Sequence, residues 1–222
     1  MPKTEKYQAD IEKMHTYLRG FLVGACMAES LKALQFAREM HKEQTRKDGT
    51  PYIVHPLSMA CYAIALGIRE DSVIATILLH DVAEDCGISV YQLPFSDDIK
   101  NGVKYMTITS FDTDKDKIET KKRYYNNLLE SKEAIICKAI DRYNNLSDMP
   151  FALSRDAIGK NVAETELLLL PVLKEAKEKW PELSNTLFVL RTNIRTVKDI
   201  LREQYKEEYK KWLDIILKEL TI

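Results

Sequence analysis

His80 and Asp81 are two metal-ligating residue types that stand side by side in an apolar run. Glu84 and Asp85 follow three to four residues later, which places them on the same helical face one turn on. Histidines and carboxylates are costly to bury unless they pair or bind an ion. An acid beside a bound metal can orient water or take its proton, so this segment predicts metal-assisted hydrolysis.

Two further candidate ligands lie in other apolar stretches, His55 upstream and Asp141 downstream. With His80 and Asp81 they offer two imidazoles and two carboxylates. Such a donor set suits Mn²⁺, Fe²⁺ or Zn²⁺, and geometry rather than affinity selects among these ions. A structural zinc site built from cysteines is not expected, because the four cysteines show no CxxC spacing.

Each of these residues also has a structural interpretation. His55 can simply open a helix, and Asp141 can pair internally with Arg142. Glu84 and Asp85 can be solvated acids at the end of a helix, although acids there oppose the helix dipole. The joint occurrence of these residues on three apolar stretches favours the metal site.

The spacing of apolar residues predicts the elements that must position this site. Only seven glycines and seven prolines punctuate the 222 residues, and apolar residues recur at three- and four-residue steps. We therefore expect an all-α helical bundle with a C-terminal helical extension. The expected helices cover residues 5–19, 28–44, 55–66, 70–85, 97–107, 115–130, 132–146, 155–179 and 183–220.

Breaker residues indicate where the chain turns. The run Asp48-Gly49-Thr50-Pro51 predicts a turn that leads His55 onto the start of a new helix. Gly87 is expected to end the helix that carries His80 and Asp81. Pro171 is expected to kink or divide the helix over 155–179.

A narrow apolar stripe flanked by Lys and Glu follows Pro181. It predicts one long helix or a hairpin over 183–220, either packed back on the domain or pairing with a second chain as a homodimer. We accordingly expect a main domain over residues 1–180 and a C-terminal helical extension over residues 181–222.

The charge balance limits the classes of partner. With 33 basic and 34 acidic residues the net charge is −1, so no global field points to nucleic acid or to an anionic membrane. The first twenty residues are charged throughout and lack the apolar core of a secretory signal, and the uncharged runs are too short to span a bilayer. Because no disulfide-like spacing is present, a reduced, cytoplasmic chain is expected.

Four motifs together resemble those of the HD-domain phosphohydrolases, and within them the Rel/SpoT-type guanosine 3′,5′-bispyrophosphate hydrolases. These motifs are HKEQTRKDGTPYIVHPL at 41–57, LHDVAED at 79–85, KAIDRYNNL at 138–146, and Glu164-Thr165 followed by Pro171. The resemblance covers roughly residues 28–178. It implies an HD-domain helical bundle that removes the 3′-pyrophosphate of (p)ppGpp to give GDP or GTP. Because only about forty helix-like residues follow, it further implies a stand-alone small alarmone hydrolase.

The resemblance also implies roles for individual residues. The four candidate ligands would hold one Mn²⁺, with Fe²⁺ or Zn²⁺ as alternatives, while Glu84 and Asp85 would position and activate the attacking water. The implied substrate contacts are Arg46 stacked on guanine, Lys47 and Lys138 on phosphates or neighbouring acids, Asn145 on the ribose, and Tyr52 in the pocket wall.

Other functions stay open at this level. The small hydrolases of this family include members that act on NADPH, so another nucleotide substrate is an alternative. A non-catalytic alarmone-binding module is a second alternative, although the intact Glu84 and Asp85 argue against it. A third is an antitoxin-like role that degrades the alarmone made by a toxic synthetase.

Basic residues gather between the second and third motifs and are followed by Tyr124 and Tyr125. This basic patch is either a solvated helix face or a positive rim that recruits a phosphorylated nucleotide. Its members are Lys115, Lys117, Lys121, Lys122 and Arg123.

Overall fold

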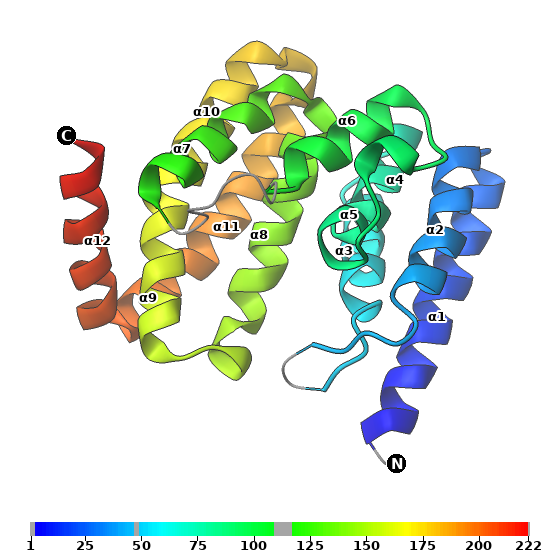
Figure 1. Cartoon of the computed structure of the whole chain (residues 1–222), viewed down its shortest axis with the longest axis horizontal. Helices are drawn as coiled ribbons and strands as arrows, with labels where there is room; N and C mark the ends of the chain where they lie inside the picture. The colour runs from blue at the N-terminus through cyan, green and yellow to red at the C-terminus, as the bar shows by residue number, and fades with distance from the viewer. Residues whose placement is uncertain (1–2, 47–48, 109–116, 222) are drawn as a thin grey trace. The chain divides into compact units, whose positions relative to one another are not determined.

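The computed structural model of the chain describes residues 3–46, 49–108 and 117–221. Within these ranges the regular elements are helices, which confirms the all-α prediction (Figure 1). In the same residues, no helix has the length and apolar character that crossing a membrane requires. The elements are α1 (Lys3–Gly24), α2 (Ala28–Met40), α3 (Val54–Ala65), α4 (Asp71–Leu79), α5 (Val82–Asp85), η1 (Val90–Gln92), α6 (Asp97–Met106), α7 (Ile118–Asn127), η2 (Leu128–Glu130), α8 (Lys132–Ala152), α9 (Arg155–Glu164), η3 (Thr165–Leu169), α10 (Leu170–Lys179), η4 (Pro181–Leu183), α11 (Ser184–Gln204) and α12 (Lys206–Leu220).

The helices fall into two compact units that share α8. The first unit comprises residues 1–107 and 131–137, and the second comprises 108–130 and 138–222. The first turns of α8 therefore belong to one unit and the remainder of the helix to the other. The domain boundary expected between residues 180 and 181 is a different division and stays a prediction.

In the first unit, α2 and α4 pack against each other and carry much of the core (Figure 1). Leu34 of α2, Leu57 of α3 and Ile74 of α4 are fully buried. Asp71 ties the starts of two helices together, because its carboxylate accepts the backbone N–H of Ser30 at 2.7 Å and that of Glu29 at 3.0 Å. These are amides that the first turn of α2 leaves without a partner inside the helix.

The single helix expected over residues 70–85 is wrong, because the helix breaks at His80 and Asp81. α4 ends at Leu79, and the short helix α5 begins at Val82. The ring Nδ1 of His80 donates to the carbonyl of Ile77 at 2.9 Å. This local bond competes for the carbonyl that the amide of Asp81 would use in a continuous helix.

The predicted turn before α3 is a small hairpin. The amide of Tyr52 donates to the carbonyl of Gln44 at 2.9 Å, and that of Arg46 donates to Thr50 at 2.7 Å. Gly49 has φ of +83° and Gly87, after α5, has φ of +68°. Both angles lie in the left-handed region that glycine adopts without strain, which confirms the expected turn and helix end.

In the second unit, the helix expected over 155–179 is divided by a change in its hydrogen bonding. A five-residue π-helical segment, Thr165–Leu169, separates α9 from α10. Pro171 lies just after it, at the start of α10. Since Pro171 has no N–H to donate and its ring crowds the preceding turn, the widened segment accommodates it, and the predicted division at this proline is confirmed.

The stripe after Pro181 forms two helices, α11 and α12, which separate at Tyr205. α12 packs on α9, and Figure 1 shows the two side by side. Gly159 of α9 makes this close crossing, because a Cβ built there would lie 2.6 Å from the backbone of Glu208. One uninterrupted helix is therefore excluded, and α12 is packed back on the fold.

Other helix ends differ from the prediction by a few residues. α1 continues to Gly24 rather than residue 19, and α2 ends at Met40 rather than 44. α8 continues through Pro150 to Ala152, because a proline near a helix end removes only a late hydrogen bond.

Candidate metal and catalytic site

His55 and His80 lie together inside the first unit. His55, on the first turn of α3, is 3% exposed, and His80, directly after α4, is 1% exposed. Their ring centroids are 5.3 Å apart. Because Nδ1 of His80 donates to the Ile77 carbonyl, Nε2 carries the lone pair that a metal ligand needs.

Asp81 lies next to this lone pair. Its Oδ2 is 2.8 Å from Nε2 of His80, and the same oxygen accepts the hydroxyl of Tyr52. A nitrogen lone pair and a carboxylate oxygen repel at this distance unless a proton or a cation lies by both. The pair therefore has the arrangement expected of two ligands of one ion.

His55, His80 and Asp141 form a group that could hold a metal. Each offers a ligand atom, these atoms lie within 4.8 Å of one another, and all three residues are buried. Two imidazoles and a carboxylate form a donor set that fits a divalent ion. The predicted ligands thus include a buried cluster that indicates a divalent metal site.

Two neighbours on α8 hold the carboxylate of Asp141. Nζ of Lys138 lies 2.9 Å from Oδ2, and Nδ2 of Asn145 donates to Oδ1 at 2.6 Å. Burial is the largest single influence and lowers the pKa of Lys138, but Asp141, Tyr124 and Tyr125 together outweigh it and leave that pKa raised, so the amine stays charged. Lys138 therefore contacts a neighbouring acid, one of the two contacts the sequence predicted for it.

Arg142 is anchored away from the site by the second unit. Its Nη1 donates to Oδ1 of Asn161 at 2.9 Å, and its Nη2 donates to the hydroxyl of Tyr125. The guanidinium is buried, and these two partners come from α9 and α7. Arg142 therefore links α8 to both neighbouring helices of its unit.

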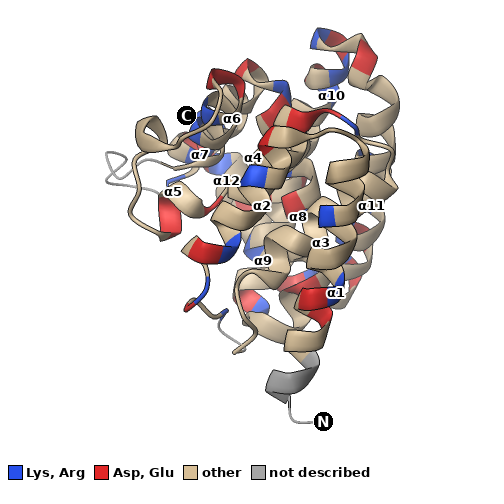
Figure 2. Cartoon of the chain, turned by 90° about the vertical axis from the view of Figure 1, so that its right-hand side faces the viewer, with Lys and Arg blue, Asp and Glu red and all other residues tan. Residues whose placement is uncertain are grey.

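Glu84 and Asp85 form the acidic end of α5, and both are exposed. Figure 2 colours acidic segments of the ribbon red, including one beside the α5 label. Partial burial of its carboxyl, followed by repulsion from Asp81, raises the pKa of Asp85, while a hydrogen bond from Tyr52 opposes that shift. A carboxylate with a raised pKa is a better proton acceptor than an ordinary one. The arrangement can therefore orient a water molecule and accept its proton.

The hairpin before α3 carries three of the predicted substrate contacts. Tyr52 lies half-buried between the rings of His41 and His55, with centroids 4.8 and 6.0 Å away. Arg46 is half-buried at the start of the turn. Lys47 lies outside the described residues. Tyr52 thus donates to Asp81, a contact that the sequence did not predict.

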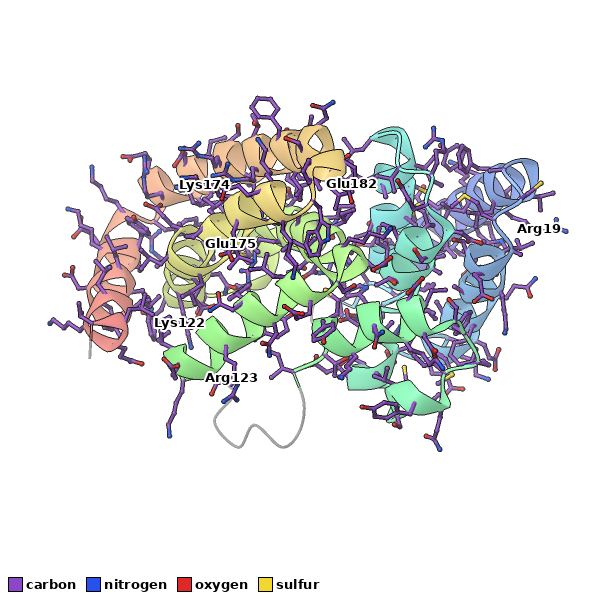
Figure 3. The ribbon with its side chains drawn as sticks, turned by 90° about the horizontal axis from the view of Figure 1, so that it is seen from above. Arg19, Lys122, Arg123, Lys174, Glu175 and Glu182 are labelled. Atoms are coloured by element: carbon purple, nitrogen blue, oxygen red, sulfur yellow. The ribbon has the colours of Figure 1, made fainter. Side chains whose placement is uncertain are left out.

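The basic patch is not uniform. Lys121 is largely buried and its Nζ lies 2.5 Å from Oε1 of the buried Glu164, so it belongs to the fold. Lys122 and Arg123 are exposed on α7, where Figure 3 labels them. Lys115 lies outside the described residues. The test of a recruiting rim therefore falls on Lys122 and Arg123.

Gln44 was missed by the sequence analysis. Its Nε2 donates to the backbone carbonyl of Asp85 at 3.1 Å, and its Oε1 is 2.6 Å from Nδ1 of His41. His41 is fully buried, as expected for a packing histidine. The only available signal was the three-residue spacing of the two polar residues just before the hairpin.

A His-Asp pair at a helix end in an all-α fold, with a second buried histidine beside it, defines an HD-type domain. Consistent with this, a family model described as "HD domain" matches residues 33–121.

Three curated relatives share a related name. The guanosine-3′,5′-bis(diphosphate) 3′-pyrophosphohydrolase MESH1 of Xenopus tropicalis is 36% identical over 125 residues, which are 54% of this chain and 68% of the relative. The guanosine-3′,5′-bis(diphosphate) 3′-pyrophosphohydrolase of Aquifex aeolicus is 30% identical over 188 residues, 82% of this chain and 25% of the relative. A probable enzyme of that name from Synechocystis is 28% identical over 206 residues, 80% of this chain and 27% of the relative.

The chain belongs to the HD-domain family, among its Rel/SpoT-type members that include MESH1. It spans about a quarter of the length of the Synechocystis and Aquifex relatives.

Proposed function

We propose that the protein is a metal-dependent hydrolase that removes the 3′-pyrophosphate of (p)ppGpp and yields GDP or GTP. The observation that carries this proposal is the buried group of His55, His80 and Asp141 in a chain whose relatives bear that name. Exposed carboxylates on α5 support hydrolysis rather than binding alone. NADPH and other nucleotides are the competing substrates.

We propose Mn²⁺ as the resident ion, with Fe²⁺ and Zn²⁺ as alternatives. His55, His80, Asp81 and Asp141 would hold it, since their imidazoles and carboxylates suit all three ions. When bound, such an ion stabilises negative charge on phosphate oxygens and favours the ionisation of water. Lys138 and Asn145 keep the carboxylate of Asp141 oriented for this purpose.

Glu84 and Asp85 are the proposed catalytic residues. Asp85 is proposed to accept the proton of the attacking water, which its raised pKa supports. Glu84 is proposed to orient that water from the same short helix. The hydroxyl of Tyr52 would steady the start of α5, because it donates to Asp81.

Substrate recognition is proposed to involve both ends of the nucleotide. The planar guanidinium of Arg46 suits stacking on guanine, and Lys47 and Lys138 suit phosphate oxygens. Asn145 is proposed to contact the ribose as well as Asp141. Tyr52 would form part of the pocket wall.

The biological setting is also a proposal. We propose that the protein acts in the cytoplasm, which the absence of disulfide-like cysteine spacing supports. A toxic alarmone synthetase is a candidate functional partner, and a homodimer through residues 183–220 is a candidate assembly. We also propose that the chain consists of an HD domain over residues 1–180 and a C-terminal helical extension over residues 181–222.

A substrate panel tests the proposal. Purified protein is incubated with Mn²⁺ and, separately, ppGpp, pppGpp, NADPH and nucleoside monophosphates, and the release of pyrophosphate is scored against that of phosphate. We expect pyrophosphate from ppGpp and pppGpp. Turnover confined to NADPH or to monophosphates would replace the proposed substrate, and no turnover of any of them would reject the enzyme.

A further inference from the structure

A polar cluster joins the C-terminal end of α2 to the C-terminal end of α5, outside the proposed ligand set. It consists of His41, Gln44 and Cys86, all in the first unit. α5 has only four residues, and a helix that short is not stable by its own hydrogen bonds. The orientation of the acids it carries must therefore depend on bonds from elsewhere in the fold.

His41 sets the orientation of the Gln44 amide. Burial lowers the pKa of His41, so its ring is neutral at ordinary pH and carries one N–H. Its Nδ1 lies 2.6 Å from Oε1 of Gln44, an atom that only accepts, so the ring hydrogen is on Nδ1. The amide oxygen of Gln44 is thus fixed toward His41, and its NH₂ group faces the opposite way.

That NH₂ group holds the end of α5. Nε2 of Gln44 donates to the backbone carbonyl of Asp85 at 3.1 Å and lies 3.5 Å from Sγ of Cys86. The thiol in turn donates to the carbonyl of Met40, at 3.7 Å. Carbonyls in the last turn of a helix have no partner within it, so a donor from another element both satisfies and positions them.

The same histidine reaches the acids by a second route. The ring of His41 packs on that of Tyr52, with centroids 4.8 Å apart and an interplanar angle of 33°. The hydroxyl of Tyr52 donates to Asp81, the residue directly before the first residue of α5. One buried ring therefore supports α5 at both ends, its last residue through Gln44 and the residue before its first turn through Tyr52.

We propose that His41 and Gln44 are positioning residues that hold α5 so that Glu84 and Asp85 meet the water at the metal site. The inference rests on the proposed function for its effect on turnover, but not for its structural part. Neither residue needs to touch substrate or metal. Misplacement of a catalytic group by about 1 Å can cost about 100-fold in rate.

Hydrogen exchange tests the structural part independently of activity. In Gln44→Ala, amide exchange in peptides covering residues 82–88 should be at least about fivefold faster than in the wild type, because α5 loses its outside donor. Glu43→Ala, an exposed neighbour, is the matched control and should exchange as the wild type does. Unchanged exchange at 82–88 in Gln44→Ala would overturn the inference, whatever the enzyme assays give.

Kinetics test the positioning part. Gln44→Ala should lower kcat by roughly 10- to 100-fold, while KM and the Kd for Mn²⁺, measured by titration without nucleotide, stay within about threefold. A rise in KM or in the Mn²⁺ Kd with kcat preserved would contradict a positioning role. If the wild-type protein showed no turnover on the substrate panel, the proposed function would be rejected. The hydrogen-exchange experiment would still test whether Gln44 holds α5.

Two substitutions of His41 separate its hydrogen bond from its packing. His41→Asn keeps a donor near the position of Nδ1 but loses the ring beside Tyr52, so it should recover only part of kcat. His41→Phe keeps a ring but loses the donor, so its kcat should match that of Gln44→Ala. In the double variant His41→Phe/Gln44→Ala, the loss should equal that of the worse single variant. If the fold-losses in kcat of the two single variants instead multiplied in the double variant, His41 and Gln44 would act independently. That result would overturn the proposal that they act together on α5.

Discussion

Asn145 donates to Oδ1 of Asp141 at 2.6 Å, from one turn further along α8. The contact places a side chain that the sequence assigned to a ribose directly on a candidate metal ligand. Partners that orient a ligand change metal affinity by about 10- to 100-fold when removed. Asn145 therefore has two candidate roles, contact with a ribose and orientation of Asp141. The contact between the two side chains supports the second role, which the motif did not suggest.

Asn145→Ala should weaken Mn²⁺ binding by about tenfold in the absence of any nucleotide, because Asp141 loses one of its orienting bonds. Titration of the metal-free protein with Mn²⁺, followed by electron paramagnetic resonance, measures the change. Asn144→Ala, the adjacent residue on the same helix, is a comparison variant. An unchanged Mn²⁺ Kd together with a raised KM would instead favour the ribose contact.

Substitutions at Asp81 and Glu84 should distinguish a residue that binds the metal from one that is needed only for turnover. Asp81→Asn should abolish both, because a predicted ligand loses its charge. Glu84→Ala should keep the metal and lower kcat by roughly 100-fold, the range that a proton-handling or water-orienting carboxylate contributes. Near-normal kcat in Glu84→Ala would remove Glu84 from the proposed mechanism. Chelation followed by Mn²⁺ addition should restore the wild type and the residual activity of Glu84→Ala, but not Asp81→Asn.

Charge reversal on α7 tests the basic patch. The double variant Lys122→Glu/Arg123→Glu should raise KM several-fold at low ionic strength with little change in kcat, and added salt should reduce the difference. Lys174→Glu, on the exposed side of α10 (Figure 3), reverses one charge outside the patch and is the charge-matched comparison for the single variant Lys122→Glu. Equal KM values for these two single variants would identify the patch as an ordinary solvated helix face.

Lys121 is omitted from that test because its charge stabilises the fold. It lies 2.5 Å from Glu164, whose side chain is only 4% exposed. Removing one partner of such a buried pair costs about 3 kcal/mol of unfolding free energy, since the other charge is left without compensation. A loss of activity in Lys121→Glu would therefore mix folding with recruitment.

Protonation of His41 should make the fold less stable in mild acid. Burial lowers its pKa in the folded protein below the ordinary value of 6.5. The unfolded chain then binds the proton more readily, so this stabilisation is fully present above pH 6.5 and is lost as pH falls toward the lowered folded value. Urea unfolding of metal-free protein at several pH values measures it, and His41→Asn should show a smaller decrease between pH 7 and 5. Identical pH dependence in the two proteins would contradict a neutral, buried His41.

The sequence predicted the buried group of His55, His80 and Asp141 better than it predicted the ends of the helices that carry these residues. His55, His80 and Asp141 could be selected because buried imidazoles and acids need an ion, whatever the exact helix ends. The break after Leu79 could not, since it depends on a bond from the His80 ring to the carbonyl of Ile77 that periodicity does not encode.

Contacts between distant segments escaped prediction for a related reason. Gln44 lies 41 positions from Asp85 and is an ordinary polar residue by composition. The pairing of Lys121 with Glu164 likewise removed one member of an apparent surface patch. Local patterns report which face of a helix is buried, but they do not report which polar side chain meets which partner.

Gly159 offers a test of how tightly α12 is held on α9. A Cβ at this position would lie 2.6 Å from the backbone carbonyl carbon of Glu208 and 2.8 Å from the amide of Tyr209. Backbone atoms cannot rotate away as a side-chain end can, so α12 would have to shift. Gly159→Ala should therefore destabilise the protein by about 1–3 kcal/mol, although alanine by itself favours a helix.

Thermal and urea unfolding of Gly159→Ala measure that loss. Gly20→Ala in α1 is the matched control, because no atom lies within 4 Å of the added Cβ and the same helix preference acts alone. It should be unchanged or more stable by up to about 1 kcal/mol. If Gly159→Ala were as stable as Gly20→Ala, α12 would not be docked at this crossing. A destabilised but still active Gly159→Ala would show that α12 supports the fold without taking part in the chemistry.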